Sequence, residues 1–450
     1  MSKAVEALRR ASYKLWGNNK AGLSNNDFNP EKLPEKVGGR ITYYKALEIN
    51  RTSLERIWNR QKNKLTEKEK QDYQIVVINP PGLKDPRRIR DDVTIPLFQD
   101  LSENQIGPHP VATITETNYS GNDPDSRVVI NNREKASRIY IVTSLVTGED
   151  FRRVNKVVSD YRRTFGKDNL KEVVVIATHF PSREDKNGKI DSATGAVRNT
   201  GQVMAIDADL ATLEGNVDRI FNLESHSSAL AALAADHGIP LLSLSPFKPL
   251  LEALDKKSFF QILSKIFVGP DEGRNIIADR IAKILKIDRV DLEKNRDSDT
   301  QETESLEIPN KLLKKLKGKD AFLYDDEGAT LGTMKHHIID KLIPSGVKSI
   351  TILLVHGKFT NGYFDKNEDW HPGWEENLNE ILTLCECNNV KFQMFVTNSR
   401  EPVGDLELYI QKHKNVIQIV NIKDYIKDIL LGDITNVDFF KDRADEIIMS

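Results

Sequence analysis

Two adjacent carboxylates and two threonines stand close together near the middle of the second half of this 450-residue chain. Residues 321–333 read AFLYDDEGATLGT, so a short apolar run ends in Asp325 and Asp326, and Thr330 and Thr333 follow in a glycine-containing turn. The backbone N–H groups of such a turn, and the start of a following helix, can hold a phosphate. The carboxylates can accept hydrogen bonds from a sugar diol or hold Mg²⁺ through water. These residue types predict a site for a phosphorylated sugar.

Other polar segments also follow apolar runs. Arg183, Glu184 and Asp185 come shortly after the run 173–177, and His226 comes after the run 220–223. A guanidinium group is well suited to phosphate oxygens, and a histidine can donate to a phosphoryl oxygen or lie beside Mg²⁺. Side chains of these types can therefore contact phosphate groups.

The elements that must position these residues are short β-branched runs separated by helix-like stretches. Apolar runs of this length fit strands buried on both faces, as in a parallel sheet with helical crossovers. Ligands bind at the carboxyl ends of the strands in such sheets. The pattern predicts an α/β fold with strands at 75–78, 139–142, 173–176, 220–223, 240–244, 266–268, 321–324, 350–355, 392–396 and 416–420.

The strands fall into two blocks. We expect an N-terminal helical extension at 1–72, a first domain at 73–247 and a second at 248–450, the last residues of which return to the first domain. The length of the chain suits two or three domains. The segment 297–307 is acidic and poor in apolar residues, which predicts a loop.

The overall composition narrows the functional classes. The net charge of −2 does not call for nucleic acid or an anionic membrane as a partner. No run approaches the roughly 20 apolar residues of a membrane helix. No export signal is predicted, which favours a cytoplasmic location. Cys385 and Cys387 cannot form a disulfide framework.

The segment 325–333 resembles the ribose-5-phosphate loop that type I phosphoribosyltransferases share with ribose-phosphate pyrophosphokinases (PRPP synthetases), written Asp-Asp-x-x-x-Thr-x-Gly-Thr. The resemblance implies that Asp325 and Asp326 hold the ribose hydroxyls or a metal. It further implies that the sugar 5-phosphate is bound by Ala329, Thr330, Leu331, Gly332 and Thr333.

Further segments resemble PRPP synthetase motifs and occur in the same order. Arg183, Glu184 and Asp185 match the ATP-site segment, and His226 matches a histidine beside the ATP phosphates and the metal. Asp271 matches a residue that faces the ribose or a second metal.

Two more matches concern loops of the same family. Lys294 and Arg296 match the start of a flexible catalytic loop that closes over the transferring phosphoryl group. Tyr119 lies, more loosely, where the family clasps adenine from a neighbouring subunit. His356 corresponds to a histidine at the rim of the active site.

The resemblance implies two tandem phosphoribosyltransferase-like domains with parallel sheets flanked by helices. It also implies transfer of the β,γ-diphosphate of Mg-ATP to the anomeric hydroxyl of a ribose phosphate, with Mg²⁺ as cofactor and a homo-oligomer, dimer or hexamer, as the active form. Glu184, Arg274 and Ala329 depart from the family pattern. These departures, with the N-terminal region, allow a larger 5-substituted ribose such as ADP-ribose in place of ribose 5-phosphate.

Two other functions stay open at this point. A phosphoribosyltransferase that consumes PRPP needs the Asp325-Asp326 loop but no nucleotide role for Arg183 or His226. A non-catalytic regulatory homologue of PRPP synthetase would tolerate the altered motifs. Retention of Lys294 and the other charged positions argues against the regulatory homologue, because a non-catalytic subunit has no chemical need for them.

Overall fold

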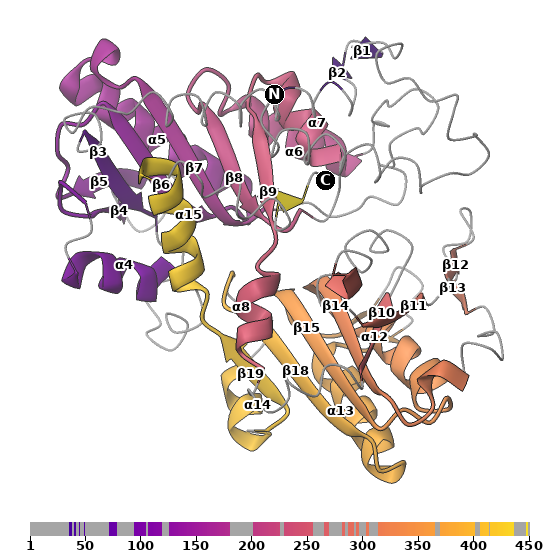
Figure 1. Cartoon of the computed structure of the whole chain (residues 1–450). Coiled ribbons are helices and arrows are strands. Elements are labelled where there is room, and N and C mark those ends of the chain that lie inside the picture. The colour runs from indigo at the N-terminus through magenta and orange to yellow at the C-terminus, as the bar shows by residue number, and fades with distance from the viewer. Residues whose placement is uncertain are drawn as a thin grey trace. The chain divides into compact units, whose positions relative to one another are not determined.

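A computed structural model of the protein shows a chain divided into two compact units, Met1–Ser245 with Lys423–Ser450, and Pro246–Ile422. Figure 1 shows the sheet of each unit and its helices. The structure describes residues 36–37, 40–41, 45, 49, 72–78, 94–104, 107–118, 126–180, 201–225, 229–254, 265–269, 281–283, 287–291, 294–296, 303–305, 314–364, 370–400, 406–413, 415–435 and 447–448.

The first unit is built on an eight-stranded sheet with the order β20-β9-β8-β7-β6-β3-β4-β5. Neighbouring strands are parallel, except that β5 runs antiparallel to β4 and β20 antiparallel to β9. The strands are β3 (Tyr73–Val77), β4 (Ala112–Asn118), β5 (Ser126–Asn131), β6 (Arg138–Ser144), β7 (Glu172–His179), β8 (Arg219–Leu223), β9 (Leu241–Leu244) and β20 (Ile447–Ile448).

The second unit is built on a six-stranded sheet with the order β11-β10-β14-β15-β18-β19, and every pair in it is parallel. The strands are β10 (Lys265–Gly269), β11 (Asp288–Asp291), β14 (Asp320–Gly328), β15 (Ser349–Gly357), β18 (Lys391–Thr397) and β19 (Ile417–Val420). Short antiparallel pairs join β12 (Lys294–Arg296) to β13 (Thr303–Ser305) and β16 (Tyr363–Phe364) to β17 (Trp370–His371).

The two sheets share one topology. Without the antiparallel edge strands β5 and β20, the strands of the first sheet stand in the order second, first, third, fourth, fifth, sixth along the chain, and so do those of the second sheet. The α/β fold with two parallel-dominated sheets is therefore confirmed, and the two units are structural copies in their strand order.

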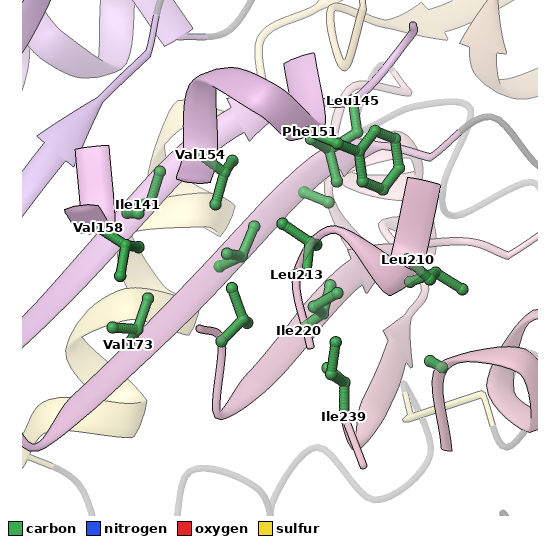
Figure 2. Close-up of a cluster of buried hydrophobic side chains, with 14 of the residues drawn as sticks. Ile141, Leu145, Phe151, Val154, Val158, Val173, Leu210, Leu213, Ile220 and Ile239 are labelled. Carbon is green, nitrogen blue, oxygen red and sulfur yellow. The ribbon is translucent and has the colours of Figure 1, made fainter. Parts of the chain in front are cut away.

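Each core lies between a sheet and the helices on it because the central strands carry apolar side chains on both faces. Figure 2 shows such a cluster in the first unit, where side chains of β6 and β7 meet those of α5 (Gly148–Phe165). The second unit has its own core around β14, β15 and α13 (Trp374–Cys387). Cys385 belongs to it, and burial raises the pKa of its thiol to about 11.

The other helices connect or follow the strands. They are α4 (Thr94–Glu103), α6 (Gly201–Ala211), α7 (Ala229–Asp236), α8 (Phe247–Glu252), α12 (Gly332–His336), which continues as a π-helix at His337–Leu342, α14 (Leu406–Lys412) and α15 (Lys423–Thr435). None of those in the described ranges is both long and apolar enough to cross a membrane.

The C-terminal segment belongs to the first unit. Helix α15, yellow in Figure 1, contacts α4. Lys427 Nζ lies 2.8 Å from Asp100 Oδ2, and Lys423 Nζ lies 3.5 Å from Oδ1 of the same residue. The hydrogen bond from Lys427 lowers the pKa of Asp100 below its ordinary value. The sequence-based ranges 73–247 and 248–450 differ from this division, which falls after Ser245 and again after Ile422.

Most of the predicted helical extension, 1–72, lies outside the described residues, but β1 (Lys36–Val37) and β2 (Arg40–Ile41) form an antiparallel pair there. Residues 297–307, predicted as a loop, include strand β13. That prediction was wrong for Thr303–Ser305, because backbone pairing with β12 forms a strand without an apolar pattern.

His237 lies between two carboxylates at the end of α7. Its Nδ1 is 3.0 Å from Glu214 Oε2 and its Nε2 is 3.1 Å from Asp207 Oδ1. Partial burial disfavours the charged imidazole, but the hydrogen bonds to both carboxylates outweigh it and raise the pKa of His237 above 6.5. The stabilisation is therefore complete below the unfolded-state pKa and is lost as the pH rises through the folded-state pKa.

We expect His237→Gln to lower the free energy of unfolding by about 1 kcal/mol near pH 5.5 and by less near pH 8.5. Urea unfolding of both proteins at the two pH values measures the difference. Replacement of Asp207 by Asn and Glu214 by Gln serves as the control, since it should remove the pH dependence. An equal deficit at both pH values would contradict the assignment.

Candidate functional site

The segment 325–333 begins in β14, at the place where the strand order of the second sheet reverses. β10 and β14 are neighbours, but β10 leads to β11 on one side and β14 leads to β15 on the other. In open α/β sheets the ligand site lies at the carboxyl ends of two such strands, because the loops that follow them diverge. The topology therefore favours the loops after β10 and β14 as the ligand site of this unit.

The strand continues further than the sequence indicates. Asp325 and Asp326 are residues of β14 itself, which runs on to Gly328 because β15 pairs with it up to the partners Gly328 and Gly357. Asp325 is half-buried, whereas Asp326 is buried, with 1% of its surface exposed. The N–H of Asp326 donates to Asp325 Oδ1 at 3.0 Å.

Three successive carbonyl groups of the loop accept hydrogen bonds from two later parts of the chain, residues 358–360 and Asn377. Gly328 O accepts from the N–H groups of Lys358, at 2.9 Å, and Phe359, at 3.0 Å. Ala329 O accepts from the N–H of Thr360 at 3.0 Å. The third carbonyl, that of Thr330, accepts from Asn377 Nδ2 at 2.8 Å.

These contacts fix the direction of the N–H groups. In a trans peptide the C=O and N–H point in opposite directions, so the N–H groups of Ala329, Thr330 and Leu331 point away from residues 358–360 and Asn377. Within the described ranges, these three N–H groups donate no hydrogen bond. Successive N–H groups of this kind form an anion-binding concavity.

The turn into α12 completes the loop. Leu331 adopts the left-handed conformation with φ of 59° and buries its side chain, although a residue with a Cβ atom rarely takes this conformation. The N–H of Gly332 lies 3.4 Å from Thr330 Oγ1. Thr330 and Thr333 are half-buried. The turn thus has threonine side chains beside it, and the binding of a phosphate there stays a prediction.

Sequence reasoning missed two polar residues that support the loop. Lys358 Nζ forms a buried ion pair with the carboxylate of Glu327, which joins the ends of β15 and β14. Asn377, from the first turn of α13, is also buried. Lys358 could have been noticed from its position directly after His356 and Gly357. No sequence signal pointed to Asn377, because it lies 47 residues beyond Thr330.

His356 lies at the end of β15, the strand next to β14. Its Nδ1 is 2.7 Å from Ser399 Oγ, and Ser399 Oγ donates to Val355 O at 3.1 Å. The ring is buried. The structure thus places His356 one strand away from the loop, at the same edge of the sheet.

In the first unit, a carboxylate of the protein itself occupies the turn that corresponds to the loop after β14. Strand β6 has the same place in its sheet as β14, and helix α5 follows it through a short turn. There Asp150 Oδ2 accepts the N–H groups of Val146 at 2.9 Å and Thr147 at 2.8 Å, and Asp150 Oδ1 pairs with Arg153 at 2.8 Å. An internal carboxylate therefore fills the position that is open after β14.

Six of the predicted site residues lie outside the described residues. This holds for Arg183, Glu184, Asp185, His226, Asp271 and Tyr119. The backbones of Lys294 and Arg296 form β12, paired with β13. The structure does describe the strand ends that lead to two of these segments, β7 ending at His179 and β8 at Leu223.

The carboxyl ends of strands β7, β8 and β9 are polar. Asn222 Nδ2 donates to Ser225 Oγ at 2.9 Å, and the N–H of Ser225 donates to Ser243 Oγ at 2.8 Å. His179 Nδ1 lies 3.3 Å from Leu145 O. All four of these polar side chains are buried. They form a buried polar cluster at this edge of the sheet. The segments that contain Arg183 and His226 follow β7 and β8 in the sequence.

The sequence matches no protein-family model and no curated protein. The fold is similar to that of phosphoribosylpyrophosphate synthetase from Mycobacterium smegmatis, a solved structure, with a TM-score of 0.53 and 15% sequence identity over 80% of this chain and 98% of that chain. At this identity the similarity concerns the fold. It agrees with two tandem phosphoribosyltransferase-like domains, the architecture predicted from the sequence.

Proposed function

We propose that the chain is an ATP-dependent pyrophosphokinase whose acceptor is ribose 5-phosphate or a larger 5-substituted ribose such as ADP-ribose. The observation that carries the proposal is the row of three N–H groups, Ala329 to Leu331, which begins three residues after Asp326 at the strand reversal. The fold, similar to that of a phosphoribosylpyrophosphate synthetase, supports it. A phosphate held by the N–H row brings the sugar hydroxyls toward the two carboxylates.

The proposed reaction needs no covalent enzyme intermediate. The oxygen of the anomeric C1 hydroxyl attacks the β-phosphorus of ATP and forms a C1–O–Pβ bond. The bond between Pβ and the α,β-bridging oxygen breaks, so AMP leaves with that oxygen and the hydroxyl proton passes to solvent. Catalysis then consists of positioning and charge neutralisation.

The residues have separate roles in this scheme. Asp325 and Asp326 orient the ribose hydroxyls, and the loop through Thr333 binds the 5-phosphate. We assign Lys294 and Arg296 to charge stabilisation on the transferred group. We assign Arg183, Glu184, Asp185, Tyr119 and His226 to ATP, as the sequence resemblance implies.

The carboxylates of β14 are also candidate groups for holding the metal. Hard carboxylate oxygens fit Mg²⁺ held through water, and Asp325, half-buried, is accessible for this. In the ranges that the structure covers, no group of three or more His, Cys, Asp or Glu could hold a metal by itself. We propose that His226 and Asp271 add to the metal site. When bound with ATP, Mg²⁺ would neutralise charge on the phosphates.

The direct test is AMP release from ATP and Mg²⁺ with ribose 5-phosphate and ADP-ribose supplied separately. AMP formed with one sugar and not the other supports the proposal and identifies the acceptor. Folded protein that releases no AMP with either sugar would overturn it. Consumption of a base with PRPP in the absence of ATP would then indicate a phosphoribosyltransferase, and loss of Mg-ATP binding a regulatory homologue.

The assembly is a further part of the proposal. If Tyr119 clasps adenine across subunits, the active form is a homo-oligomer, a dimer or a hexamer. Light scattering during size-exclusion chromatography measures its mass.

A further inference from the structure

Asn377 is a buried amide that contacts the phosphate-loop backbone from a distant helix. It lies in the first turn of α13 with 2% of its surface exposed. Its Nδ2 donates to Thr330 O at 2.8 Å and to Pro372 O at 3.2 Å. Both amide hydrogens are therefore used, one on the loop and one on the segment before the helix.

The other end of the same amide is not used. Among the described residues, Asn377 Oδ1 has no hydrogen-bond partner although it is buried. An unsatisfied buried acceptor costs stability, and an apolar residue of the same size would avoid that cost. Packing alone thus does not explain an asparagine here, whereas its donations to Thr330 O and Pro372 O do, and the shorter of the two is made to the loop.

The donation has a stereochemical consequence. A trans peptide with its carbonyl held toward Asn377 must direct its N–H the opposite way, so the contact fixes the direction of the Leu331 N–H. Leu331 is left-handed, a conformation that costs energy for a residue with a Cβ atom. Loss of the contact would leave the Thr330–Leu331 peptide free to rotate and relax that conformation.

We propose that Asn377 is a positioning residue that turns the Leu331 N–H toward the phosphate of the sugar substrate. The identity of that substrate rests on the proposed function, whereas the binding of an anion by the loop does not. Asn377 itself touches no substrate. Its effect reaches the phosphate only through the Thr330–Leu331 peptide.

The test compares Asn377→Leu and Asn377→Asp with Asn379→Leu, a change in the same helix that removes the acceptor of the Tyr409 hydroxyl. Calorimetric titration with inorganic phosphate and with ribose 5-phosphate is expected to show about tenfold weaker binding for both Asn377 variants and no change for the control. The KM for the sugar phosphate should rise by the same factor while the KM for ATP stays constant. The unfolding temperature of Asn377→Leu should stay within a few degrees of that of the wild type, because the change removes one unsatisfied acceptor but also takes the side-chain donor from Thr330 O and Pro372 O.

The contrary outcomes are distinct. Unchanged phosphate binding in Asn377→Leu overturns the inference, as does a wild type that binds no phosphate. A rise in both KM values together with a lower unfolding temperature assigns Asn377 a merely structural role and also overturns it. If the wild type releases no AMP but binds phosphate, and Asn377→Leu loses that binding, the positioning role stands and the pyrophosphokinase proposal fails.

Discussion

Replacement of Asp325 and Asp326 by asparagine is expected to lower AMP release by about a thousandfold, the loss that follows removal of a group that stabilises or orients the reacting atoms. Asparagine keeps the size of each side chain but removes the negative charges and half of the acceptor capacity. The ribose hydroxyls would lose their acceptors, and Mg²⁺ its nearby carboxylates. Coupled detection of AMP with each sugar measures the effect.

A matched substitution separates this result from a general effect of charge. Asp340→Asn removes an exposed carboxylate from the helix that follows the same loop, where Asp340 pairs with His336 at 3.2 Å. It should leave AMP release within about twofold of wild type, since surface changes rarely matter. If the Asp325 and Asp326 variants keep full activity, the two carboxylates have no part in the reaction.

The central strands could be predicted from sequence because burial on both faces demands continuous apolar runs. All ten predicted runs coincide with strands of the two sheets. Strands β4, β5 and β11 were missed. Threonine occupies every second position of β4 (ATITETN), β5 (SRVVIN) has an apolar run of only three residues, and β11 reads DRVD. All three lie at or beside the edge of a sheet, where a strand need not carry apolar side chains on both faces. The periodicity of the sequence alone therefore did not distinguish these strands from loops.

The candidate site was predictable only where it is local. The order of residues in 325–333 indicated a strand, carboxylates and a phosphate-sized turn, because these depend on neighbours in sequence. The contacts that orient the turn come from Lys358, Thr360 and Asn377. The spacing of these residues in the sequence does not predict their contacts with the loop. The folded connection between β15 and β18 brings them there.

Buried polar side chains illustrate the same limit. Gln74, the second residue of β3, donates to Pro110 O at 2.9 Å and to Asn132 O at 2.7 Å. Its Oε1 accepts from the N–H of Glu134 and from the Tyr161 hydroxyl, so the side chain is fully satisfied inside the core. A glutamine in a strand pattern reads as solvent-facing until its partners are known.

Gly373→Ala is expected to destabilise the second unit by about 3 kcal/mol, the upper range for overpacking a buried position. A Cβ atom at Gly373 would lie 2.3 Å from the backbone nitrogen of Gly362 and 2.7 Å from the carbonyl carbon of Asn361. Backbone atoms cannot move aside as a side chain can. The strain would therefore displace the chain next to Thr360, whose N–H holds Ala329 O and whose carbonyl accepts from Trp374. The same change should raise the KM for the sugar phosphate.

Gly373→Ser separates the steric effect from helix capping, because Gly373 is the N-cap residue of α13. Serine is a better N-cap than alanine by about 1 kcal/mol, yet it carries the same Cβ atom. Urea unfolding, followed by the fluorescence of Trp370 and the buried Trp374, should show both variants strongly destabilised. Recovery of wild-type stability in the serine variant would assign the effect to capping. Wild-type stability in both would contradict the close approach of Gly373 to residues 361 and 362, and with it the route by which α13 holds the loop.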